Sequence, residues 1–128
     1  MATFDTLITG GTVANTCATF KADVGIRNGK IAALGIDLGE ARQTIDASGK
    51  YVLPGGIETH CHIAQESATG AMTADEYYSG SVSAAFGGNT TIVPFAAQHR
   101  GQKISDVVQI YDDRAAPNSV LDLSLIHI

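Results

Sequence analysis

The sequence has few basic residues and no long apolar run, and each shortage excludes a class of protein. Only 8 of its 128 residues are lysine or arginine, against 13 acidic residues, so the net charge is −5. The densest basic stretch, around Arg100 and Lys103, is too sparse for a nucleic-acid-binding patch. No run of about 18 apolar residues is present, which excludes a transmembrane helix.

Signals for secretion and for disulfide bonding are also missing. The N-terminus lacks the charged and apolar regions of a signal peptide. Two cysteines, Cys17 and Cys61, are too few for a disulfide framework. A content of 45% hydrophobic and 16% charged residues is typical of a globular protein. We therefore expect a soluble, cytoplasmic protein with neither a nucleic-acid nor a membrane partner.

Residues 1–52 are predicted to form a small β-rich module. The strongest signal is Asn28-Gly29 between two strand-like runs, because both positions of a tight hairpin turn favour positive φ. That pattern predicts a hairpin over residues 22–34. Further strands are expected at residues 6–9, 12–14 and 51–53, with turns at residues 10–11 and 46–50.

Residues 53–128 show a different pattern, in which strands and helices alternate. Strands are expected at residues 57–63, 90–96 and 119–123, and helices at residues 73–86 and 104–115. This alternation is typical of βαβ units with a parallel sheet, here an α/β fold that begins a (β/α)₈ barrel. A complete barrel needs about 200–250 residues, so the chain is expected to be truncated, with an incomplete barrel.

The first of these helices has recognisable end signals. Thr73 followed by Glu76 is the pattern of a capping box, and Gly87-Gly88 is a suitable helix stop. The residues expected on its buried face are Tyr78, Val82, Ala85 and Phe86, with Tyr77 on the surface.

The chemistry is indicated by His60 and His62. Side chains alternate along a strand, so the two imidazoles are expected on one face together with Glu58, opposite Cys61. Two neighbouring imidazoles suit Zn²⁺ or a similar metal. The alternative is that the two histidines bind no metal and are polar residues at a strand end whose hydrogen bonds are satisfied. Cys61 itself is interpreted as a packed thiol rather than a ligand.

The order GGIETHCH at residues 55–62 resembles the signature of the amidohydrolase superfamily, in its dihydropyrimidinase/hydantoinase branch. The likeness extends over residues 4–123. It includes segments at residues 7–13, 23–35, 45–50 and 95–101.

The resemblance implies that the chain is an N-terminal part of an enzyme with a two-metal (β/α)₈ barrel. A β-sandwich built from both ends of the full-length chain accompanies that barrel. His60 and His62 match its first-strand ligands, and the expected cofactor is a pair of divalent ions, with zinc the expected metal. A carboxylated lysine, two further histidines and an aspartate would lie on later strands, so no catalytic residue is expected within this chain.

The implied reaction opens dihydropyrimidines or 5-substituted hydantoins to N-carbamoyl amino acids, as in pyrimidine catabolism, in a homotetramer. The chain alone is expected to be inactive and to bind metal weakly. Two alternatives stay open: a sister cyclic amidase (allantoinase or dihydroorotase), or a non-catalytic scaffold homologue. Retention of both His60 and His62 speaks against the scaffold. Glu58 departs from the family's usual aspartate and is expected to support the ligands.

Several other residues lie in segments that the resemblance places near the site. The loop at residues 64–72 is expected to border the substrate pocket, with candidates Gln65, Glu66 and Met72. For His99 a loop hydrogen bond is favoured over a substrate contact. Residues 124–128 fit the family poorly and resemble translated sequencing-adapter sequence, so His127 is expected to have no function.

Overall fold

The computed structural model describes residues 3–67 and 69–127, which belong to two compact units, Met1–Pro54 and Gly55–Ile128. The division lies within two residues of the boundary expected from the sequence. Each unit has its own core.

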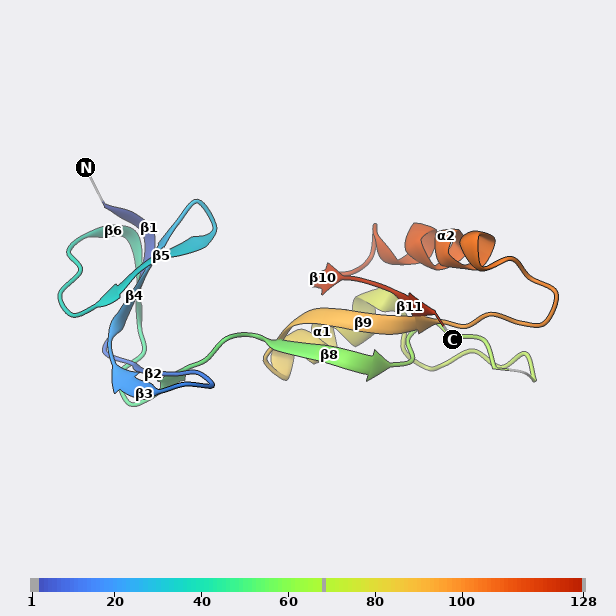
Figure 1. The fold of residues 1–128 in the computed structure, drawn as a ribbon, viewed down its shortest axis with the longest axis horizontal. Helices are drawn as coiled ribbons and strands as arrows, with labels where there is room; N and C mark the ends of the chain where they lie inside the picture. Colours follow the sequence, from blue (N-terminus) through green and yellow to red (C-terminus); the bar gives the residue numbers. More distant parts are fainter. Residues whose placement is uncertain (1–2, 68, 128) are drawn as a thin grey trace. The chain divides into compact units, whose positions relative to one another are not determined.

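The first unit consists of two small sheets (Figure 1). One has the strand order β5-β4-β1-β6, and the other has the order β3-β2-β7. Val13, Ala22 and Val24 form its buried cluster, against which Ile8, Ile26 and Val52 pack. The strands are β1 (Phe4–Thr9), β2 (Thr12–Ala14), β3 (Thr19–Lys21), β4 (Asp23–Arg27), β5 (Lys30–Gly35), β6 (Ala41–Asp46) and β7 (Tyr51–Val52).

The predicted hairpin of this unit is confirmed, whereas two of its strands were not predicted. Asn28 and Gly29 join β4 to β5 with φ values of 52° and 70°, as a two-residue turn of this kind requires. The strands that the sequence pattern missed are β3 and β6. Both are exposed and neither shows apolar alternation; β6 is held by parallel pairing with β1.

The second unit is a parallel sheet with two helices, in the predicted order strand, helix, strand, helix, strand (Figure 1). Its central strand β9 pairs in parallel with β8 on one side and with the short β10 and β11 on the other. Its elements are β8 (Gly56–Cys61), α1 (Tyr77–Phe86), β9 (Asn89–Ala96), α2 (Ile104–Ala115), β10 (Asp122–Leu123) and β11 (Ile126–His127). Over residues 55–67 and 69–127 the unit is an α/β fragment without a closed barrel.

Both helices contribute to a single core on one face of this sheet. Ile92 and Ala96 of β9 are fully buried, and they belong to the same cluster as Tyr77 of α1 and Tyr111 of α2. Residues 92, 94 and 96 share a face because side chains alternate along a strand. Phe95 therefore points to the opposite face, which carries no helix.

The start of α1 differs from the prediction, because the helix begins at Tyr77 and not at Thr73. Thr73 is tied to Gln65 instead: its N–H donates to the Gln65 carbonyl, and its hydroxyl accepts from the Gln65 N–H. The N-cap is Glu76, whose N–H donates to the Ser79 hydroxyl at 3.1 Å. The predicted stop at Gly87-Gly88 is confirmed, with φ of 88° at Gly88.

The buried face of α1 is also not the predicted one. Its buried residues are Tyr77, Gly80 and Ser81, whereas Tyr78 is 64% exposed and Phe86 is 92% exposed. A Cβ at Gly80 would lie 2.9 Å from the Ile63 side chain, so the helix approaches the sheet through its small residues. Tyr77 is the one large side chain of α1 that is buried, whereas Tyr78 and Phe86 face outward.

The strands beyond α1 show two further differences. Strand β9 continues through Pro94, which is tolerated because the partner strand β8 has an irregular register at this point. Of the predicted strand at residues 119–123, only Asp122–Leu123 is formed. Strand β11 lies beside Phe95 and Ala96, while the side chain of His127 lies outside the described residues.

Candidate metal centre

The two candidate ligands lie together at the end of β8. The imidazole centroids of His60 and His62 are 5.5 Å apart, and their planes are inclined by 66°. Both side chains are largely exposed. The predicted proximity of the pair is therefore present in the structure.

Phe95 of β9 supports both rings. Its centroid lies 4.9 Å from that of His60, edge to face, and 4.9 Å from that of His62, nearly parallel. Phe95 itself is 9% exposed. No local sequence pattern predicts this contact, because it depends on the pairing of β8 with β9.

The spacing of the two imidazoles is compatible with one shared metal ion. With Zn–N bonds of about 2.0–2.1 Å and tetrahedral angles, two bound imidazole centroids would lie roughly 5 Å apart. Within residues 3–67 and 69–127, however, no group of three His, Cys, Asp or Glu side chains could hold a metal. His60 and His62 could therefore supply two of the ligands of a metal ion, but not a complete set.

Glu58 does not share the face of the histidines, contrary to the prediction. Glu58 pairs with Ile92 of β9, and Cys61 pairs with Pro94. Ile92 and Pro94 are two residues apart in the strand, so their side chains share a face of the sheet. One extra residue of β8 lies between these two pairs, and this bulge breaks the alternation. Glu58 therefore lies on the same side as Cys61. Its carboxylate accepts from the N–H of His60 at 2.7 Å.

Cys61 packs as expected for a structural thiol. It is half-buried against the core cluster of the second unit. Burial raises the pKa of its thiol, and the nearby Glu58 carboxylate raises this pKa further. Both effects disfavour the thiolate, which is the form that binds metal.

The loop after β8 places its three candidate residues in different surroundings. The Gln65 Oε1 lies 2.6 Å from Nδ1 of His62. Glu66 lines a small hollow beside α2, together with His99 and Gln102. Met72 instead lines a cavity of about 370 Å³ between α1 and the end of α2. Only Gln65 thus contacts the histidine pair.

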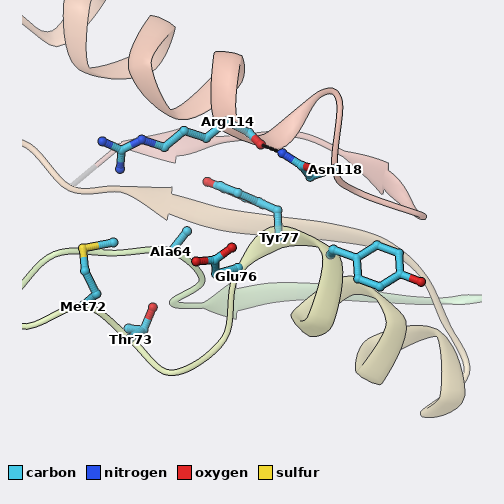
Figure 2. A pocket seen from close by; sticks show the side chains of 8 residues that line it. Ala64, Met72, Thr73, Glu76, Tyr77, Arg114 and Asn118 are labelled. Carbon is cyan, nitrogen blue, oxygen red and sulfur yellow. Dashed lines mark hydrogen bonds between the residues drawn. The ribbon is translucent and has the colours of Figure 1, made fainter.

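The cavity beside Met72 is drawn in Figure 2. Arg114 and Asn118 border it from α2 and the following turn, where the Asn118 amide donates to the Arg114 carbonyl. Neither His60 nor His62 lines it. This cavity therefore belongs to the helix side of the sheet, away from the candidate ligands.

His99 makes a loop hydrogen bond and does not lie with His60 and His62. Its backbone N–H donates to the Gln102 side chain at 2.8 Å. The hollow that it lines contains neither His60 nor His62.

Several known proteins that resemble this chain are D-hydantoinases. A D-hydantoinase of Ralstonia pickettii is 42% identical over 118 residues, which are 92% of this chain and 26% of that protein. A solved structure of a D-hydantoinase superposes with a TM-score of 0.91 at 40% identity, over 97% of this chain and 27% of that one. This chain belongs to the hydantoinase/dihydropyrimidinase family. The family expected from residues 55–62 is confirmed.

The chain is also similar to proteins with other names. A rat (Rattus norvegicus) dihydropyrimidinase is 36% identical over 93% of this chain and 24% of its own length. An Escherichia coli allantoinase is 41% identical over 70% of this chain and 19% of its own length. An N-acyl-D-glutamate deacylase of Bordetella bronchiseptica, solved with zinc and a phosphonate inhibitor, has a TM-score of 0.64 at 25% identity, over 97% of this chain and 29% of its own.

The matches cover only a part of each relative. The chain spans about a quarter of the length of the D-hydantoinases that it matches. No protein-family model matches it. Among the described residues, no helix is long and apolar enough to cross a membrane.

Proposed function

We propose that this hydantoinase-family chain forms the first part of a metal-dependent hydrolase that opens cyclic amides. Its substrates would be dihydropyrimidines or 5-substituted hydantoins, and its products N-carbamoyl amino acids. The observation that carries this proposal is the pairing of His60 and His62, 5.5 Å apart at the end of the first strand of a parallel βα series. Active sites of barrel enzymes are built at these strand ends.

His60 and His62 would hold one of two divalent ions, with zinc the proposed metal. A bound zinc polarises a carbonyl and lowers the pKa of its water to about 7, as hydrolysis of an unreactive amide requires. Within this chain, the Phe95 ring keeps the two imidazoles side by side. The other expected ligands, a carboxylated lysine, two histidines and an aspartate, would come from later strands of the longer protein.

We further propose that the 128-residue chain alone is inactive and binds metal weakly. Its described residues bring two imidazoles together but offer no third ligand. A structural zinc site normally has four ligands and a catalytic one at least three from the protein.

A second candidate function within the same chemistry is allantoin hydrolysis. It is favoured by the 41% identity to an allantoinase, over 90 residues. The partner in either case is a small cyclic amide. A cytoplasmic homotetramer remains our proposal for the longer protein, with no nucleic-acid or membrane partner.

An activity assay of the purified full-length protein with three substrates distinguishes these functions. The substrates are dihydrouracil, a 5-substituted hydantoin and allantoin. We expect turnover of the first two, loss of turnover after chelation and recovery on adding Zn²⁺. Preference for allantoin would favour the second function. Turnover that survives complete metal removal would contradict both, and turnover by the 128-residue chain would contradict its proposed inactivity.

A further inference from the structure

Gln65 contacts Nδ1 of His62. This contact leaves Nε2, the other ring nitrogen, available to bind a metal. The Oε1 of Gln65 lies 2.6 Å from Nδ1 of His62. A neutral imidazole carries a proton on one nitrogen and a lone pair on the other. Since an amide oxygen only accepts hydrogen bonds, a hydrogen bond at this contact requires the proton on Nδ1, which leaves the lone pair of a neutral ring on Nε2.

The position of Gln65 is fixed by its backbone. Its N–H donates to the Thr73 hydroxyl at 3.0 Å, and its carbonyl accepts from the Thr73 N–H at 3.0 Å. The intervening loop is closed a second time by a bridge between Glu66 and Met72. The amide of Gln65 thus extends toward His62 from an anchored point.

The ring of His62 is held on a second side by Phe95, which stacks on it with planes 20° apart. Stacking restrains the tilt of the imidazole but leaves open which nitrogen is protonated. The hydrogen bond from Nδ1 to Gln65 selects the tautomer with the proton on Nδ1.

We propose that Gln65 is a positioning residue that selects Nε2 of His62 as the metal-binding nitrogen. This inference rests on the proposed function, in which His62 is a ligand. Metal-bound histidines usually donate their other N–H to a carbonyl or carboxylate, and losing that partner typically weakens metal affinity by about 10–100-fold.

The test compares Gln65→Leu with Gln65→Glu in the full-length protein. Leucine has a similar size but no acceptor, whereas glutamate keeps an oxygen beside Nδ1. We expect Gln65→Leu to weaken Zn²⁺ binding about 10–100-fold, measured by competition with a coloured chelator. Gln65→Glu should bind Zn²⁺ as tightly as the wild type or more tightly.

The matched control is Gln98→Leu, since Gln98 is an exposed glutamine whose amide donates to the Gln102 carbonyl and not to a histidine. It should leave Zn²⁺ affinity unchanged. A second readout is the ¹⁵N NMR spectrum of His62 without metal. It should show protonation at Nδ1 in the wild type and loss of that tautomer in Gln65→Leu.

The outcomes separate this inference from the function on which it rests. Equal Zn²⁺ affinity in Gln65→Leu and the wild type would overturn the role of Gln65, and so would equal weakening in the leucine and glutamate variants. If His62→Ala also kept wild-type affinity, the ligand assignment itself would fail. If only His62→Ala lost affinity, the ligand assignment would stand and the role of Gln65 would fall.

Discussion

The imidazole of His62 stacks on the ring of Phe95, with centroids 4.9 Å apart and planes inclined by 20°. Phe95 lies on β9, whereas His62 follows β8, so this contact joins the ends of two neighbouring strands. The same Phe95 ring also meets the edge of His60. One side chain thus sets the spacing of both candidate ligands.

Replacing Phe95 by leucine should therefore loosen this strand end. We expect the free energy of unfolding of the chain to fall by about 1–2 kcal/mol, because the ring stacking and part of the buried volume are lost. Urea titration measures this change. Phe86→Leu is the control, since Phe86 is 92% exposed and its replacement should change stability by no more than about 0.5 kcal/mol. Equal effects of both changes would show that Phe95 has no special role.

Tyr77 should make the stability of the chain depend on alkaline pH. Burial raises the pKa of its phenol from 10.0 to about 12. The folded state favours the neutral phenol, and this stabilises the fold fully at a pH below the pKa of Tyr77 in the unfolded chain. The stabilisation is lost as the pH rises toward the pKa of Tyr77 in the folded chain. Stability measured by urea should therefore decline between about pH 10 and pH 12, more steeply in the wild type than in Tyr77→Phe.

The same variant tests the hydroxyl of Tyr77 at neutral pH. Within the part of the chain that the structure describes, this buried oxygen has no hydrogen-bond partner. Removing it should leave stability unchanged or raise it by up to about 1 kcal/mol, because no hydrogen bond is lost. A loss larger than about 1 kcal/mol would show that the hydroxyl is paired in solution.

Ser81 should be the most sensitive polar position of α1. It is fully buried, and its hydroxyl accepts from the N–H of Val120 and donates to the carbonyl of Tyr78, each at 3.1 Å. Ser81→Ala leaves the Val120 N–H unpaired and should lower the free energy of unfolding by about 1–3 kcal/mol. Ser83→Ala, on the exposed side of the same helix, should change it by less than about 0.5 kcal/mol. A neutral Ser81→Ala would disprove the role given to this contact.

Sequence reasoning succeeded where a local pattern decides the structure. Asn28-Gly29 specified its hairpin because both residues accept positive φ. The apolar spacing within residues 104–115 predicted a helix, and α2 spans Ile104–Ala115. The family could likewise be identified from residues 55–62.

Sequence reasoning failed where contacts between distant segments decide the structure. Thr73 has the pattern of a helix cap, but its bonds to Gln65 hold it outside the helix. Glu58 was assigned to the histidine face, but the bulge in β8 turns it to the other face. A bulge changes every later position of a strand, and the pattern of β8 alone does not reveal one.

The most direct test of the proposed metal centre is the metal content of the full-length protein. Wild type, His60→Ala and His62→Ala would be compared by elemental analysis after purification, with His99→Ala as the control outside the pair. We predict bound divalent metal in the wild type and in His99→Ala, and loss of metal together with hydrolysis in the other two variants. Full metal content and an unchanged rate in His60→Ala would contradict the account.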